Sequence, residues 1–553
     1  MSQGQTSAIA RLPAPESLSL AEQVAQMVVV RASGHLFDHE IRYPDWEADS
    51  ATLTRYVEEL GVGGVILLGG SAAEVGLKTQ ALQTQARIPL LIAADVEEGV
   101  GQRFSGATWF PPPMALSAVA DGDLATALAY AEAFGAATAA EALAIGINWV
   151  LVPTVDINNN PQNPVINVRA FGDHRERVCA LTQAFLRGAQ SQPVLTAAKH
   201  FPGHGDTAID SHLELPVLPH DRDRLNTVEL EPFRTAIAAG ADAIITAHLR
   251  IPALDTHHPA TLSAPTLTGL LRQQMRFDGL IVTDALIMGA ITNAYGPYEA
   301  AVLAVEAGAD VLLMPSDPEG VIAAVVEAVN RGRLTPARIL ASVERLWRAK
   351  QKAAPTLTTD GSGHAWEHLP PPPVQLSGLA QPATRRLAAD ILTASMTVQG
   401  QVLAATTADP GVNLVLVDDV VGCRFLDPTA AAMTRPQGHH YRLKLIDTQG
   451  CIQAPQDTSL RPSLVQIFVR GNPFRGSATL LRLATTWLEA LHQADLLRGI
   501  VIYGSPYALE QLRPHFKQVP YGFTYGQMPL AQSLILPLLL PNAVATKNRE
   551  FTD

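Results

Sequence analysis

The feature that most constrains this chain is the alternation, over residues 24–315, of short apolar runs with longer alanine-rich amphipathic stretches. Continuous β-branched runs are typical of strands covered on both faces, and therefore of a parallel sheet. Eight βα units in roughly 300 residues match the size of a TIM barrel, whereas the alternative, a doubly wound open sheet, rarely has eight such repeats. We therefore predict a TIM (β/α)8-like barrel with strands at 24–31, 64–68, 90–95, 148–156, 194–200, 243–248, 279–284 and 310–314.

Helical patterns lie between these strands, and a helical tail at 321–352 is expected to close the barrel domain. The clearest patterns repeat apolar residues at helical spacing. They occupy residues 124–144, 175–190, 230–239, 266–275 and 298–307.

The length of 553 residues favours two domains. A Pro-, Thr- and Gly-rich stretch at 353–377 is typical of a linker, which predicts a barrel domain at 1–352 and a second domain at 378–553. The second domain has strand-like runs and one helical pattern, with turn motifs GNPF and GSPY after two of the strands. We predict a smaller three-layer α/β domain from the strands 412–417, 464–469 and 500–503, the helix 477–494, and the turns 471–474 and 504–507.

Composition excludes several classes of partner. Hydrophobic residues make up 47% of the chain and charged residues 17%, and the formal charge of −12 argues against nucleic-acid and anionic-membrane partners. Cys179, Cys423 and Cys451 form no metal or redox motif and indicate a reducing compartment. No secretory h-region and no bilayer-length apolar run is visible, and the proline-interrupted run at 534–541 reads as a buried element, so we expect a soluble, cytoplasmic protein. No pattern indicates a cofactor or an oligomeric state.

The stretch KHFPGHGDTAIDSH, residues 199–212, follows a predicted strand and combines glycines, histidines and aspartates that no packed core requires. Active sites on parallel α/β scaffolds are built from such loops at strand ends. Polar residues end four other predicted strands in the same way, and in a barrel these ends converge on one mouth. The strand-end residues are Asp95, Asp156, Lys199 with His200, His248 and Asp284.

Asp284, in LIVTDALIMGA, is the sharpest candidate for chemistry. A carboxylate at a barrel mouth can attack an anomeric carbon or bind a metal, and the structural alternative is an N-cap for a helix beginning at Ala285. Asp210 and His212 stand two residues apart, so in an extended segment the carboxylate can orient the imidazole as a proton donor. The alternative for this D-S-H triplet is an ordinary surface turn.

Other interpretations of the polar residues remain open. His200, His204, His212, His248 and Asp284 suggest a metal-dependent hydrolase, but the first predicted strand lacks the histidine pair that such barrels use, so we expect no catalytic metal. Arg103, Arg169 and Lys199 suit hydroxyl-rich ligands or form salt bridges with Asp95 or Asp156. His204 could only structure its loop, and Trp109 is better explained by packing than by sugar stacking.

Together these residues resemble glycoside hydrolase family 3, in its β-N-acetylglucosaminidase branch. KHFPGHG followed by DSH matches that branch at 199–205 and 210–212, and Asp284 in VTDAL matches the position of the nucleophile. The segment 156–173 is similar to the branch's stretch that ends in a sugar-binding arginine, here Arg169. Residues 94–104, ADVEEGVGQRF, are similar to D-x-E-G-G-R-V-x-R-F, with Glu98, Val100 and Gly101 departing from it. The resemblance marks Asp95, Arg103, Arg169, Lys199 and His200 as sugar ligands, and relates GNPF and GSPY to the family's C-terminal domain.

The resemblance implies a retaining mechanism in which Asp284 forms a covalent glycosyl-enzyme and His212, tuned by Asp210, acts as acid and base. The expected activity is exo-acting release of terminal GlcNAc from muropeptide-type or chitooligosaccharide fragments, in cytoplasmic cell-wall recycling. A phosphorylase on the same scaffold is the nearest rival, because a histidine acid/base tolerates phosphate better than a carboxylate does. A β-glucosidase and a catalytically silent sugar-binding protein are further alternatives.

Overall fold

The computed structural model describes residues 12–209, 214–353, 373–448, 460–470 and 477–541. The chain forms two compact units, Met1–Ala388 and Ala389–Asp553. The predicted linker 353–377 lies mostly outside the described residues, and the two units meet in sequence within helix α13 (Pro382–Ser395), so the predicted boundaries remain predictions. Among the described helices, none combines the length and the apolar character that crossing a membrane requires.

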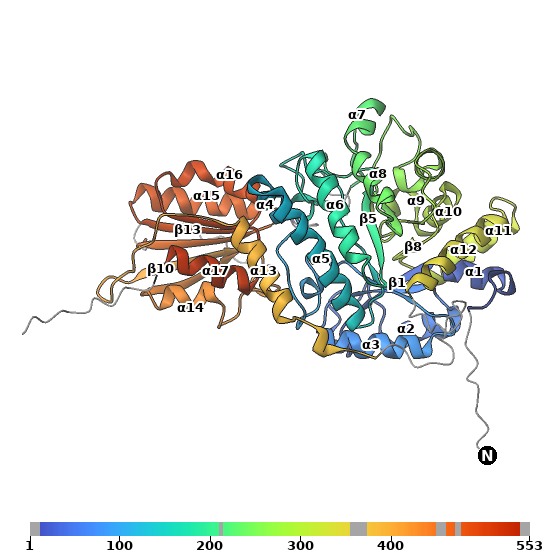
Figure 1. Cartoon of the computed structure of the whole chain (residues 1–553), viewed down its shortest axis with the longest axis horizontal. Helices are drawn as coiled ribbons and strands as arrows, with labels where there is room; N and C mark the ends of the chain where they lie inside the picture. The colour runs from blue at the N-terminus through green and yellow to red at the C-terminus, as the bar shows by residue number, and fades with distance from the viewer. Residues whose placement is uncertain (1–11, 210–213, 354–372, 449–459, 471–476, 542–553) are drawn as a thin grey trace, which may run out of the picture. The chain divides into compact units, whose positions relative to one another are not determined.

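Eight parallel strands form the barrel of the first unit, and each lies within or overlaps a predicted strand (Figure 1). They pair in the order β7-β6-β5-β4-β3-β2-β1-β8, and a parallel bridge between Val282 and Val311 connects the two ends of the sheet. The strands are β1 (Val28–Ser33), β2 (Gly64–Leu68), β3 (Leu91–Ala94), β4 (Trp149–Val150), β5 (Leu195–Phe201), β6 (Ala243–Thr246), β7 (Leu280–Val282) and β8 (Leu312–Leu313).

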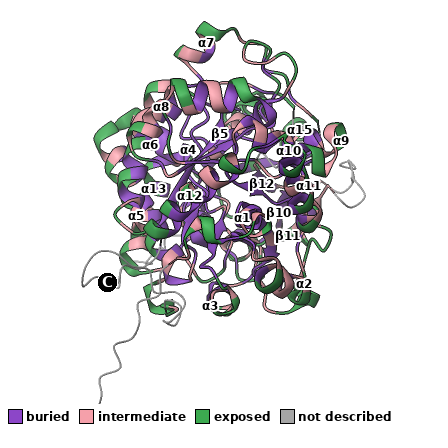
Figure 2. Cartoon of the chain, turned by 90° about the vertical axis from the view of Figure 1, so that its right-hand side faces the viewer, coloured by how far each residue is buried: buried purple, intermediate pink, exposed green. Residues whose placement is uncertain are grey.

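Helices surround the barrel, with buried inner faces and exposed outer faces (Figure 2). This arrangement explains why the strands carry no polar alternation, since both faces of the sheet are covered. The helices are α1 (Leu20–Gln26), α2 (Ser50–Arg55), α3 (Ala72–Gln85), α4 (Met114–Gly122), α5 (Leu124–Ala144), α6 (Arg175–Ala189), α7 (Arg222–Thr227), α8 (Glu231–Ala238), α9 (Gly289–Tyr295), α10 (Pro297–Ala307), α11 (Pro318–Asn330) and α12 (Pro336–Ala353).

Two glycines set the close packing of α5 against α6. A Cβ on Gly135 would lie 2.2 Å from the carbonyl oxygen of Phe185, and a Cβ on Gly188 would lie 1.8 Å from that of Glu132. Both distances are far below van der Waals contact, so any larger residue would have to push the two helices apart.

Three elements differ from the sequence-based prediction. The helical tail at 321–352 is two helices, α11 and α12, separated by a turn at Gly332, whose φ of +74° is readily adopted by glycine. The expected helix at 266–275 is a π-helix, Pro265–Gln274. The expected strand at 148–156 is reduced to Trp149–Val150, because Pro153 has no N–H for the ladder.

The second unit is a three-layer α/β domain, as predicted. Its sheet has the order β11-β10-β12-β13-β14-β9, in which β9 alone is antiparallel to its neighbour. The predicted strands correspond to β10, β12 and β13, whereas β9, β11 and β14 were not predicted. The strands are β9 (Thr397–Gln399), β10 (Gly411–Val417), β11 (Tyr441–Asp447), β12 (Ser463–Val469), β13 (Leu497–Gly504) and β14 (Tyr521–Thr524).

Helices pack on both faces of this sheet, with a separate apolar cluster on each side. Helices α15 (Ala478–Gln493) and α16 (Pro506–Leu512) contribute to one cluster with Leu414 and Leu416 of β10. Helices α14 (Ala431–Gln437) and α17 (Pro529–Leu539) contribute to the other with Val415 and Val417. Alternate residues of one strand therefore face opposite layers. The run at 534–541, expected to be a buried element, lies mostly in α17, with Ile535, Leu536, Leu539 and Leu540 buried and Leu538 exposed.

Cys179 and Cys423 are free and partly exposed, and Cys451 lies outside the described residues. The GNPF motif at 471–474 also lies outside them. GSPY begins with the last residue of β13 and continues into α16, where Ser505 precedes the helix and Pro506 is its first residue.

Candidate active site

Polar residues gather at the carboxyl end of the barrel strands, as the sequence predicts. Asp95 directly follows β3, Lys199 and His200 lie near the end of β5, and Asp284 comes two residues after β7. Because every barrel strand is parallel, these positions share one end of the barrel.

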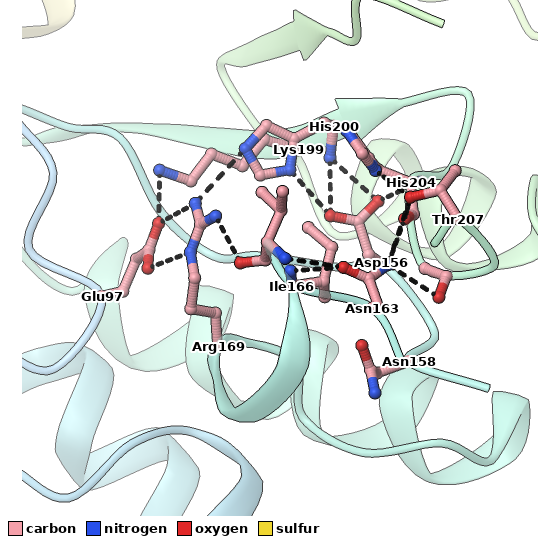
Figure 3. A network of polar contacts seen from close by, with 12 residues as sticks. Glu97, Asp156, Asn158, Asn163, Ile166, Arg169, Lys199, His200, His204 and Thr207 are labelled. Atoms are coloured by element: carbon pink, nitrogen blue, oxygen red, sulfur yellow. Dashed lines mark hydrogen bonds and ion pairs between the residues drawn. The ribbon is translucent and has the colours of Figure 1, made fainter. Parts of the chain in front are cut away.

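A buried carboxylate, Glu97, holds two cations together (Figure 3). Arg169 donates to it in a bidentate pair, Nε to Oε2 at 2.8 Å and Nη2 to Oε1 at 2.7 Å. The ammonium of Lys199 lies 2.7 Å from Oε1 of Glu97 and 2.6 Å from Oδ1 of Asp95. Three segments far apart in sequence are thus joined by charge-assisted hydrogen bonds, which are the strongest kind.

The ionisation of this cluster follows from its pairing. Burial alone would raise the pKa of the Glu97 carboxyl, but the charges of Arg169 and Lys199 and their hydrogen bonds hold it well below its usual value. Burial would likewise lower the pKa of Lys199, but Asp95 and Glu97 raise it. Glu97 and Lys199 are therefore both charged at neutral pH.

Asp156 organises the turn after β5. Its carboxylate accepts from the backbone N–H of His200 at 3.1 Å, from the backbone N–H of His204 at 2.7 Å, and from Nδ1 of His200 at 2.8 Å. Since Nδ1 donates to the carboxylate, Nε2 of His200 can accept from Arg169 Nη2, 3.4 Å away. His200 therefore connects Asp156 to Arg169. Burial alone would raise the pKa of Asp156, but the charge of His200 and the hydrogen bonds from His200 and His204 lower it.

His204 helps to hold its own loop in place, which is one of the two roles that the sequence suggests for it, the other being a metal ligand. Its ring Nδ1 lies 2.9 Å from the hydroxyl of Thr207, and burial lowers its pKa to about 4, so it is neutral at pH 7. Asn163 fastens this loop from the neighbouring segment, donating to the carbonyls of His204 at 2.8 Å and Gly205 at 3.0 Å. The turn after β5 is thus fixed by hydrogen bonds to Asp156 and Asn163, which precede it in sequence, and to Thr207, which follows His204.

Asp284 is half-buried at the end of β7 and is not a helix N-cap, since α9 begins only at Gly289 with Met288 as its cap. Its Oδ1 accepts from the N–H of Ala285 at 2.8 Å, and its own N–H donates to the hydroxyl of Thr246 at 3.3 Å. The charge of Asp284 also acts on the pKa of His204. Since β5 and β7 are parallel strands of one barrel, Asp284 stands at the same end of the barrel as the turn after β5.

The other predicted site residues have mixed outcomes. Arg103 donates to the backbone carbonyl of Asp95 at 2.9 Å, which fixes the strand end. The indole N–H of Trp109 donates to Glu98 at 2.8 Å. Asp210 and His212 lie in the segment 210–213, outside the described residues.

Three histidines of the metal interpretation, His200, His204 and His248, contact protein groups, and the fourth, His212, lies outside the described residues. His200 and His204 bond as above, and His248 contacts Thr261 and the carbonyl of Ala285. Within the described ranges, the residues spaced as metal ligands are His35, Glu40 and Glu74, none of which belongs to that set.

Glu97 is the residue whose importance sequence reasoning missed. It stands in the stretch 94–104 that resembles the family's motif, and its position two residues after Asp95, just beyond a predicted strand, was a usable signal. Asn163 and Thr207 gave no signal, since their partners come from other segments of the chain.

Comparison with known proteins places both units in one family. Residues 19–349 match the model for the glycosyl hydrolase family 3 N terminal domain, and residues 404–541 match that for the bacterial glycosyl hydrolase family 3 C-terminal domain. The chain is 33% identical over 378 residues to beta-hexosaminidase A of Pseudoalteromonas piscicida, covering 62% of this chain and 60% of that protein. It is 38% identical over 264 residues to a beta-hexosaminidase of Alkalilimnicola ehrlichii, covering 47% of this chain and 75% of that protein.

A solved structure extends the likeness across both units. The family 3 beta-N-acetylglucosaminidase of Paenibacillus sp. str. FPU-7 superposes with a TM-score of 0.75 at 31% identity, covering 94% of this chain and 97% of that one. Barrel, second domain and motifs thus agree with the resemblance drawn from the sequence, and this chain belongs to glycosyl hydrolase family 3.

Proposed function

We propose that this protein is a retaining, exo-acting β-N-acetylglucosaminidase. The observation that carries the proposal is the polar network at the carboxyl end of the barrel strands, in which Asp95, Arg169, Lys199 and His200 are connected at the same end of the barrel as Asp284. Family membership supports glycoside hydrolysis, and the relatives named beta-hexosaminidase support an N-acetylhexosamine as the sugar.

Burial separates the groups that would touch the sugar from those that support them. The Asp95 side chain is 32% exposed, whereas those of Glu97 and Asp156 are 3% and 0% exposed. Asp95 would therefore accept hydrogen bonds from sugar hydroxyls, with the other two carboxylates acting behind it. The side chain of Lys199 is as buried as that of Glu97, at 3% exposed, and it directs two of its three ammonium hydrogens at Asp95 and Glu97. Its proposed role as a sugar ligand therefore rests on the family resemblance and not on its exposure.

In the first chemical step, a carboxylate oxygen of Asp284 would attack the anomeric carbon as the bond from that carbon to the leaving oxygen breaks. His212, oriented by Asp210, would give its ring proton to the leaving oxygen. In the second step, water would attack the same carbon and pass a proton to His212, releasing the Asp284 carboxylate and the sugar with its original configuration.

The natural substrate belongs to the same proposal. We infer a muropeptide-type or chitooligosaccharide fragment with a terminal β-linked GlcNAc, degraded in the cytoplasm during cell-wall recycling. Incubating purified muropeptides and chitooligosaccharides with the enzyme, and identifying released GlcNAc by mass spectrometry, would distinguish the two substrate types.

The decisive experiment compares aryl β-GlcNAc with aryl β-glucoside, using the wild-type protein and Asp284→Ala. We expect turnover of the GlcNAc substrate by the wild type only, with circular dichroism unchanged in the variant. Preference for the glucoside would indicate a β-glucosidase, and GlcNAc-1-phosphate formed in phosphate buffer would indicate a phosphorylase. Sugar binding without turnover by the wild type would refute the enzymatic proposal.

A further inference from the structure

The segment that carries Asp284 is held by hydrogen-bonding side chains from the end of β6 and from the residues that follow it. Thr246 is the last residue of β6, His248 follows two residues later, and Thr261 lies in a short 3₁₀ helix, Ala260–Leu262. All three side chains belong to residues with 0% exposure. Buried polar side chains are costly unless they are hydrogen-bonded, so their contacts decide what they are for.

The contacts reach the backbone on both sides of the Asp284–Ala285 peptide bond. The N–H of Asp284 donates to Oγ1 of Thr246 at 3.3 Å, and Oγ1 of Thr261 lies 2.9 Å from that hydroxyl. Nδ1 of His248 and the carbonyl oxygen of Ala247 each lie 2.9 Å from the same oxygen of Thr261, so both can accept from its single hydroxyl hydrogen.

The other ring nitrogen of His248 completes the connection. Nε2 lies 3.1 Å from the carbonyl oxygen of Ala285. A carbonyl only accepts, so Nε2 must carry the proton in this contact. One chain of side chains therefore joins the amide of Asp284 to the carbonyl of the next residue.

The segment after β7 needs such support because no helix orders it. The residues between β7 and α9 form turns, held on the β8 side by backbone bonds from Leu286 to Leu313 and from Ile287 to Met314, both about 3 Å long. Within this segment, the N–H of Ala285 binds Oδ1 of Asp284 at 2.8 Å and so sets the rotation of the carboxylate. Any shift of the peptide at Ala285 would turn the carboxylate with it.

We propose that Thr246, Thr261 and His248 are positioning residues for the nucleophile, fixing the backbone on both sides of Asp284 so that its carboxylate faces the anomeric carbon. This inference rests on the proposed function, since it requires Asp284 to be the nucleophile. A misplacement of about 1 Å at a reacting group can cost a factor of about 100 in rate. Removing the network should therefore reduce the rate of the first chemical step more than substrate affinity.

The test is Thr246→Val, which keeps the shape of the side chain and removes the hydroxyl that receives the Asp284 amide. Pre-steady-state release of the aryl alcohol from aryl β-GlcNAc measures the first step. We expect a loss of about 10- to 100-fold in that rate with KM changed by less than about twofold. Thr246→Ser restores the hydroxyl and should bring the rate back to within about threefold of the wild type.

Thr182→Val is the matched control, because Thr182 is equally buried in α6 and its hydroxyl has no hydrogen-bond partner among the described residues. It should leave rate and melting temperature unchanged. If Thr246→Val fails to fold, His248→Gln, which keeps an N–H donor for Ala285, is compared with His248→Met, which does not. The inference then requires His248→Gln to be the faster of the two.

The outcomes separate this inference from the proposed function. A wild type without glycosidase activity, or an active Asp284→Ala variant, would overturn the proposed function and the inference together. An active wild type with a folded Thr246→Val variant of normal first-step rate, or with no rescue by Thr246→Ser, would overturn the positioning role alone.

Discussion

Replacing Glu97 with glutamine tests whether one buried carboxylate holds the sugar-binding cations in place. The substitution keeps the size of the side chain and removes the charge that faces Arg169 and Lys199 at 2.7–2.8 Å. Lys199 would retain Asp95, but the guanidinium of Arg169 would lose its bidentate partner in a site where both cations are largely buried. Breaking a buried ion pair by removing one partner costs about 3–5 kcal/mol. Because an amide oxygen can still accept one bond, we expect a loss near the lower limit, about 3 kcal/mol.

The pH dependence of this loss has a defined sign. The pKa of Glu97 in the folded protein is lowered well below 4.5, the value for an unperturbed glutamate. A group with a depressed folded pKa contributes stability above its unfolded pKa and loses it as the pH falls through the folded pKa. The difference in free energy of unfolding between wild type and Glu97→Gln should therefore be largest at pH 6–7, about two units above the unperturbed glutamate pKa. It should shrink as the pH falls below about 4.5.

The assay is equilibrium urea unfolding at several pH values, followed by circular dichroism and by intrinsic tryptophan fluorescence, to which Trp149, fully buried in β4, contributes. Glu327→Gln is the matched control, because its partner Arg331 is exposed and such pairs contribute less than about 1 kcal/mol. A Glu97→Gln variant as stable as the control variant at pH 7, or a stability difference that does not shrink on acidification, would refute the assigned role of Glu97.

Three further predictions concern catalysis, the base of the barrel and helix packing. His212→Ala should slow substrates with poor leaving groups by at least about 100-fold and activated aryl glycosides far less, because only the former need a proton; an equal loss on both, measured as kcat, would argue against its acid role. Lys350→Met should lower the free energy of unfolding by about 2 kcal/mol, because the buried ammonium serves three acceptors at 2.6–3.0 Å that would lose their donor; unchanged urea unfolding would contradict this. Gly188→Ala should destabilise the barrel by about 1–3 kcal/mol in the same assay, because its Cβ would meet the Glu132 carbonyl, whereas Gly122→Ala, with nothing within 4 Å, should be neutral; equal effects would refute the packing argument.

The elements that the sequence predicts well are those governed by local pattern. The strand at 64–68 and the helix at 124–144 have the predicted bounds, because an uninterrupted apolar run and a long alanine-rich amphipathic stretch each admit one structure. The strands β9 and β14, the last two in the order of the second sheet, have no comparable signal, since they are short and acquire their identity only by pairing with neighbours. Gly332 marks the break in the predicted helical tail, but a single glycine within an otherwise periodic pattern does not by itself announce a helix end.

The sequence alone determined the barrel, the strand ends that carry polar residues and the candidate nucleophile, because alternation of strand and helix and the composition of a loop are properties of neighbouring residues. Only the tertiary structure decided what those polar residues do for one another. Glu97 bonds to Arg169 across 72 residues, Lys199 bonds to Asp95 across 104, and Thr246 bonds to Asp284 across 38. Such contacts depend on how distant strands are brought side by side, and a hydrogen bond formed in that way leaves no periodic trace in the chain.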